Sequence, residues 1–170
     1  ILVNGKVDIN LGFYNTKKLE SVSRIMIRPG LFHSTKNLYK ETATILEIET
    51  PIDKDDLVRF KDEYGRENKP YENKNSMIKL DKNDPVFEDP KLNERKTYTV
   101  NGVLIAICKT NNIDRLKSSR KDSIFAVLEG GLVSNDNKYV LSPGDIVGME
   151  TIEKLTEVFK INNYITYLNI

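Results

Sequence analysis

Alternating apolar and polar residues predict short strands along most of the chain. The alternation starts at the N-terminal end, where Val3, Val7, Ile9 and Leu11 are separated by polar residues and by Gly5. Successive side chains of a strand point to opposite faces, so this period of two is typical of strands with one buried face. Further strands are expected over residues 22–28, 43–50, 97–100, 103–108, 123–128, 131–134, 138–141 and 161–170.

Only one segment carries a helix-like pattern. In residues 151–159, Ile152, Leu155 and Val158 fall on one side of a helix, although the same segment also fits two strand fragments. Residues 53–95 hold many Asp, Lys, Asn and Pro residues and are interpreted as a long irregular connection, which leaves room for a helical turn at residues 55–61. The predicted class is therefore all-β.

A weak internal repeat divides the chain into two halves. Residues 2–7 resemble residues 127–132, because each stretch is a strand that reaches a glycine and leaves as another strand. Further along, residues 27–30 and residues 141–145 both turn through Pro-Gly. Two copies of this order of strands and turns predict two related β-barrels.

These motifs resemble those of the cupin superfamily. Residues 125–133 are similar to the end of the first cupin motif, and residues 139–146 are similar to the turn that opens the second. In the front half, Gly30, His33 and Asn37 match the Gly-x2-His-x3-Asn close of the second motif. One departure is that the proline here directly precedes the glycine, whereas the family pattern places it two residues before.

The resemblance implies two cupin-type jelly-roll barrels. A partial front barrel is expected in residues 1–52, a connecting segment or lid in residues 53–95, and a rear barrel in residues 96–170. Because Gly5 already corresponds to the end of the first motif, and the sequence opens within a strand pattern without Met, the front barrel is expected to be truncated at its N-terminal edge. A second chain would cover such an open edge, so a homodimer is expected.

A fainter similarity points to cupin proteins of bacterial surface-sugar pathways. It involves residues 33–35, 47–51 and 56–66. This similarity implies that the ligand is a small polar molecule, a sugar or sugar phosphate, and that the protein is an isomerase or epimerase of carbohydrate metabolism. The alternative is a non-catalytic cupin whose barrels have lost their ligands and which serves as a binding or structural partner.

The motif spacing predicts no metal site within the sequence. The resemblance implies a metal set of two His and one Glu in the first motif and one His in the second, which would suit a divalent ion. The Glu position of the rear motif is occupied by Ser123, which cannot replace a carboxylate. The front barrel retains only His33, so a divalent metal cofactor is expected only if ligands lie upstream of Ile1.

The predicted site lies in the front barrel. His33 and Glu47 are the candidate catalytic residues, because an imidazole and a carboxylate can transfer protons. The alternatives are a half-buried structural imidazole and a solvated carboxylate. The long polar segment is expected either to fold over the barrel mouth as a lid or to be a solvated connector. Its ligand-binding candidates are Arg59, Tyr64, Arg66 and Tyr71.

The later strands are expected to contribute no comparable polar group. Their aromatic residues Tyr139, Tyr164 and Tyr167 are interpreted as packing residues. Cys108, the only cysteine, lies in an apolar run and is interpreted as a small buried apolar residue. A single cysteine excludes a disulfide within the chain and suits a reducing compartment, so a cytoplasmic location is expected.

Charge restricts the partners. Lys and Arg number 26 and Asp and Glu number 25, so the formal net charge is +1. Nucleic acids demand a basic face, and an anionic membrane attracts basic segments. The balance of charges therefore argues against both partners.

Overall fold

The computed structural model describes residues 1–49, 57–67, 69 and 85–170. These residues belong to two compact units: one joins Ile1–Ile48 with Val86–Ile170, and the other is Glu49–Pro85. Among the described residues the regular secondary structure is mostly antiparallel β-sheet, in line with the predicted all-β class, and no closed barrel is found. Within the same residues, no helix has both the length and the apolar content that a membrane crossing needs.

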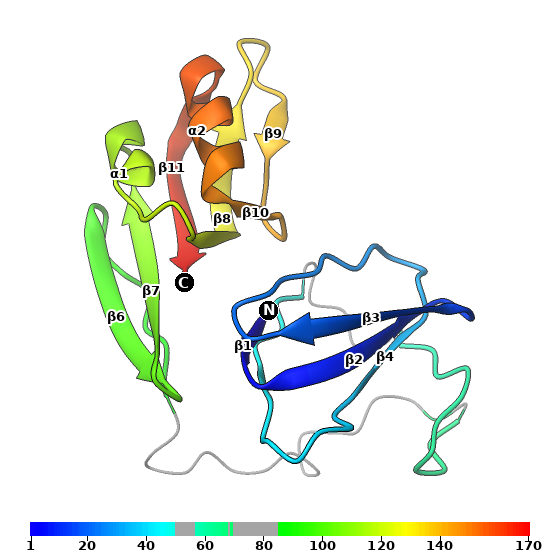
Figure 1. Cartoon of the computed structure of the whole chain (residues 1–170). Helices are drawn as coiled ribbons and strands as arrows, with labels where there is room; N and C mark the ends of the chain where they lie inside the picture. Colours follow the sequence, from blue (N-terminus) through cyan, green and yellow to red (C-terminus); the bar gives the residue numbers. More distant parts are fainter. Residues whose placement is uncertain (50–56, 68, 70–84) are drawn as a thin grey trace. The chain divides into compact units, whose positions relative to one another are not determined.

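The largest sheet is built from the second half of the sequence. Its central strands are β8 (Ile124–Val133), β11 (Lys160–Asn169) and β7 (Val103–Thr110), with β6 (Glu94–Val100) at one edge and β10 (Ile146–Gly148) at the other (Figure 1). A short strand, β9 (Tyr139–Leu141), also pairs with β8. All of these pairs are antiparallel. The strands predicted over residues 97–100, 103–108, 138–141 and 161–170 are thereby confirmed, whereas those predicted over residues 123–128 and 131–134 are parts of one strand, β8.

Two helices accompany this sheet. The longer helix, α2 (Met149–Val158), confirms the helical interpretation of this segment over the two strand fragments. Its buried face consists of Met149, Ile152 and Thr156, whereas Val158 is 70% exposed, so the stripe predicted from the sequence was rotated. The sequence did not predict α1 (Ile113–Lys117), a short helix whose N-cap side chain, Asn112, accepts a hydrogen bond from the Asp114 amide at 2.9 Å.

Apolar clusters are buried on both faces of the large sheet. On one face, Cys108, Phe125 and Ile165 form a buried cluster with Leu116 of α1 and Ile152 of α2. On the other face, residues of alternate positions form a second buried cluster, which also includes Ile1 and Val3; its buried members are Ile1, Val3, Ile105, Ile124, Ala126, Leu168 and Ile170. The interpretation of Cys108 as a buried apolar residue is confirmed, since it is 6% exposed.

The first half of the sequence forms two smaller sheets. One has the order β3 (Asn15–Glu20), β2 (Lys6–Leu11), β4 (His33–Lys36), and the other pairs β1 (Leu2–Asn4) with β5 (Thr44–Ile45). The predicted open edge over residues 1–11 is not found in the described residues, because β2 has partners on both sides and β1 pairs with β5 and bridges to Ser23. The homodimer therefore stays a prediction without this edge to support it.

Two strand predictions in this half were wrong. Residues 22–28 form no strand beyond the isolated bridge between Ser23 and Leu2. The backbone cannot continue as a strand there, because Val22 has a positive φ of 60°. The strand predicted over residues 43–50 shrinks among its described residues to β5, whose partner β1 is only three residues long. No helix occurs in residues 57–61, and the rest of the helical turn expected at residues 55–61 lies outside the described residues.

Val22 occupies a strained position in a turn. Its amide donates to the Leu2 carbonyl at 2.9 Å, and the Leu2 amide donates to the Ser23 carbonyl at 2.9 Å. These two hydrogen bonds fix the backbone of Val22 in the left-handed region, which a β-branched residue rarely adopts. The side chain is 42% exposed, so its partial burial offsets little of this strain.

We expect Val22→Asn to raise the free energy of unfolding by about 1 kcal/mol, because Asn tolerates the left-handed region far better than Val does. Chemical denaturation would measure the change. Val158→Asn, at an exposed position with helical backbone, is the matched control and should change stability little. An equal effect of the two substitutions would contradict the assignment of strain to Val22.

Candidate functional site

His33 and Glu47, the predicted catalytic residues, both lie on the surface. His33 begins β4, opposite Leu11 of β2, and its Nδ1 lies 3.1 Å from the Leu31 carbonyl oxygen. The imidazole is exposed rather than half-buried. Glu47 is also exposed and follows β5. Among the described residues, no hydrogen bond or ion pair joins the two side chains.

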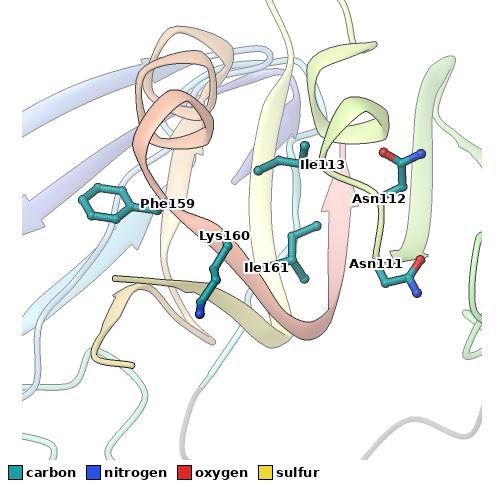
Figure 2. A pocket seen from close by; sticks show the side chains of 6 residues that line it. All are labelled: Asn111, Asn112, Ile113, Phe159, Lys160 and Ile161. Carbon is teal, nitrogen blue, oxygen red and sulfur yellow. The ribbon is translucent and has the colours of Figure 1, made fainter. Parts of the chain in front are cut away.

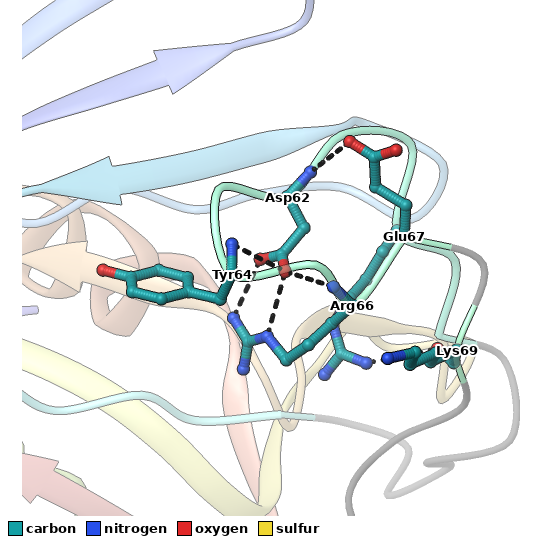
Figure 3. A network of polar contacts seen from close by, with 6 residues as sticks. Asp62, Tyr64, Arg66, Glu67 and Lys69 are labelled. Carbon is teal, nitrogen blue, oxygen red and sulfur yellow. Dashed lines mark hydrogen bonds and ion pairs between the residues drawn. The ribbon is translucent and has the colours of Figure 1, made fainter.

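Three of the four predicted ligand-binding residues are among the described residues of the Glu49–Pro85 unit, where Asp62 organises two of them (Figure 3). The Asp62 carboxylate accepts hydrogen bonds from the Tyr64 amide at 3.1 Å and from the Arg66 amide at 2.7 Å. It also accepts from the Arg66 Nε at 3.2 Å and a terminal guanidinium nitrogen at 3.0 Å. Arg59 donates instead to the Lys69 carbonyl at 3.2 Å. Tyr71 lies outside the described residues.

Asp62 was not among the predicted site residues, although it lies within residues 56–66. Asp followed by Gly three residues later is a turn signal, because the Asp side chain accepts from nearby backbone amides and Gly65 supplies a positive φ of 71°. The guanidinium of Arg66 also lies over the Tyr64 ring, 5.2 Å from its centroid. Hydrogen bonds from Arg66 are the main cause that lowers the pKa of Asp62 to about 2.

A second polar group lies on the large sheet, where the sequence predicted only packing tyrosines. We call it the Lys109 cluster; it consists of Lys109 on β7, Glu129 on β8, Tyr164 and Thr166 on β11, and Asp89. Lys109 and Glu129 both pair with Thr166, so these three side chains form one row across the sheet.

The Glu129 carboxylate is the centre of the Lys109 cluster. It accepts hydrogen bonds from the Tyr164 hydroxyl at 2.5 Å and from the Thr166 hydroxyl at 3.3 Å. It also forms an ion pair with Lys109 at 3.3 Å, and the Lys109 ammonium lies 3.5 Å from Asp89. The same ammonium lies 4.7 Å from the centroid of the Tyr164 ring. The interpretation of Tyr164 as a packing residue was therefore wrong, whereas Tyr167 is buried against Phe125 as expected.

A glycine brings these side chains together. Gly130 follows Glu129 with a positive φ of 67°, and a Cβ at this position would lie 2.1 Å from the carbonyl oxygen of Tyr164. The pairing of β8 with β11 shifts register at this point, which is typical of a β-bulge. Gly130 lies within residues 125–133, and its structural role is this close approach of two backbones.

The contacts within the Lys109 cluster stabilise one protonation state of each of its groups. The hydrogen bond from Tyr164 is the main cause that lowers the pKa of Glu129, and the ammonium of Lys109 lowers it further. The same hydrogen bond raises the pKa of Tyr164. Burial by itself would lower the pKa of Lys109, but its bond to Glu129 outweighs this effect and raises the pKa. Near neutral pH the cluster therefore contains a carboxylate, an ammonium and a protonated phenol.

A shallow depression of about 440 Å³ lies at the end of the sheet, beside α1 (Figure 2). Its aliphatic residues Ile113 and Ile161 lie between Lys160 on one side and the two asparagines Asn111 and Asn112 on the other. None of the predicted site residues lines it.

The described residues contain no group of three or more His, Cys, Asp or Glu side chains placed to hold a metal ion. The chain matches no protein-family model, and no curated protein or solved structure matches it.

We expect Gly130→Ala to destabilise the protein by about 3 kcal/mol or more, because the new methyl group would overlap the Tyr164 carbonyl. Gly102→Ala is the matched control: Gly102 also has a positive φ, 79°, but no atom lies within 4 Å of the place that a Cβ would take. That substitution should cost about 1 kcal/mol, from backbone strain alone. If chemical denaturation gave equal losses in the free energy of unfolding for the two variants, the close approach of Gly130 to Tyr164 would not contribute to stability.

The Asp62 turn should depend on pH. Because the pKa of Asp62 is lowered from 3.8 to about 2, the stabilisation of the turn is fully present above the unfolded value and is lost as the pH falls towards 2. NMR titration of the Tyr64 and Arg66 amides should give a midpoint near 2, and Arg66→Gln should move it upwards. A midpoint near 3.8 in the unmodified protein would contradict the network.

Proposed function

We propose that this protein is a cupin-type protein that binds a small polar molecule, a sugar or sugar phosphate, at the Lys109 cluster. The observation that carries the proposal is the convergence of a carboxylate, an ammonium, two hydroxyls and an aromatic ring around Glu129 on one face of the sheet. Each sugar hydroxyl both donates and accepts hydrogen bonds, so a mixed set of this kind suits a polyhydroxylated ligand.

The pairing of the two rear motifs supports the cupin part of the proposal. The Gly144 amide donates to the Val127 carbonyl at 2.9 Å, and the Val127 amide donates to the Asp145 carbonyl at 2.9 Å. The Pro-Gly turn of the second motif thus lies beside β8, the strand that contains the glycine bulge of the first. Jelly rolls are built from antiparallel strands, so this pairing is compatible with a cupin barrel.

Binding, rather than proton transfer, is the role that the Lys109 cluster suits. A general base works best when its pKa lies near the working pH, and a general acid likewise. The lowered pKa of Glu129 makes it a weak base, and the raised pKa of Tyr164 makes it a weak acid. The cluster therefore favours the non-catalytic alternative over an isomerase or epimerase that would use these side chains.

Glucose and glucose 6-phosphate are suitable probes for titration calorimetry. Glu129→Gln and Tyr164→Phe should each weaken binding of whichever probe binds by about tenfold, because each removes a hydrogen-bonding or charged group from the centre of the cluster. Glu150→Gln is the matched control, since Glu150 is an exposed carboxylate paired with Lys154 on α2.

The same titrations test the site predicted from the sequence. His33→Ala and Arg66→Ala should leave the affinity within about twofold of the unmodified protein. If these variants lose affinity and the Glu129 and Tyr164 variants do not, the ligand binds around His33 or Arg66 instead. The absence of binding by both probes would overturn the proposal itself.

A further inference from the structure

We propose that the Lys109 cluster selects its ligand by charge and binds an amino sugar or a neutral sugar in preference to a sugar phosphate. This inference rests on the proposed function and narrows its ligand class. It follows from the number and the exposure of the charged groups that a ligand would meet.

The single cation of the cluster is already compensated. The Lys109 ammonium lies 3.3 Å from Glu129 and 3.5 Å from Asp89, so two carboxylates share one positive charge. The two carboxylates outnumber the one ammonium, so an arriving phosphate would meet an excess of negative charge rather than a free ammonium.

The carboxylates of the Lys109 cluster are more exposed to solvent than its ammonium group. The Lys109 side chain is 17% exposed, whereas Glu129 is 52% exposed and Asp89 is 74% exposed. A ligand that approaches the row consequently contacts carboxylates before it contacts the ammonium. Carboxylates are good acceptors for sugar hydroxyls and form stronger, charge-assisted hydrogen bonds with an ammonium group.

The neighbouring ion pair does not change this balance. Lys96 on β6 pairs with Ile107, which lies two residues before Lys109 on β7. The Lys96 side chain forms an ion pair with Glu88. This pair is neutral as a whole. Its hydrogen bond raises the pKa of Lys96 and lowers that of Glu88, so both groups stay charged near neutral pH.

The expected selectivity is modest because the site is open to water. Two unit charges about 4 Å apart in water interact strongly enough to change an affinity by about fivefold. Glucosamine should therefore bind about fivefold more tightly than glucose, and glucose 6-phosphate should bind several-fold more weakly than glucose. Raising the ionic strength should bring the three affinities together.

Titration calorimetry with glucosamine, glucose and glucose 6-phosphate at slightly acidic pH and low ionic strength tests the inference. Asp89→Asn removes one exposed carboxylate, which forms an ion pair with Lys109, and should narrow the preference for glucosamine over glucose at least twofold. Asp122→Asn is the matched control, because Asp122 is an exposed carboxylate paired with Arg120 outside the cluster.

The outcomes separate this inference from the proposed function. Tighter binding of glucose 6-phosphate than of glucose by the unmodified protein would overturn the charge selection and leave sugar binding intact. An unchanged order of affinities in Asp89→Asn, with the preference for glucosamine as wide as before, would also overturn it. If none of the three probes binds, both the proposed function and the selectivity are wrong.

Discussion

The close approach of Gly130 to the carbonyl of Tyr164 is the contact on which the large sheet depends. A Cβ there would come within 2.1 Å of the carbonyl oxygen, so no other residue fits without moving a central strand. The bulge at this point lets β8 and β11 pair on both sides of it, and these two strands lie in the middle of the sheet. The bulge also brings the side chains of Glu129 and Tyr164 into contact. The same backbone conformation therefore determines both the strand pairing and the geometry of the Lys109 cluster.

The sequence predicted the second half of the fold better than the first. From residue 97 onwards the main strands are marked by continuous apolar runs, such as residues 103–108 and 124–128, because the large sheet buries apolar residues on both faces. These strands and α2 were found at the expected places. Residues 22–28 alternate with a period of two but form no strand, since the backbone hydrogen bonds of Val22 and Ser23 to Leu2 make a turn. An alternating pattern shows that a segment could form a strand, but it does not show whether a neighbouring strand is available to pair with it.

The candidate site was harder to predict than the fold. Glu129 and Tyr164 are 35 residues apart in sequence, and only the shifted register of the bulge makes them neighbours. The turn around Asp62 is local, and its Asp-x-x-Gly spacing was visible, yet Arg66 was interpreted only as a donor to a ligand. In the structure the Arg66 guanidinium uses two of its nitrogens for Asp62, so part of the fork that would hold an anion is occupied.

Because Cys108 is buried, its reactivity can report how often the folded structure opens around it. The thiol is 6% exposed on β7, between the sheet and its helices, and burial raises its pKa, so the reactive thiolate is scarce in the folded state. An alkylating reagent can modify this thiol only while the strands or the helices packed around it open. The rate of alkylation therefore measures how often the centre of the sheet becomes accessible, with no label introduced and with no second cysteine to confuse the signal.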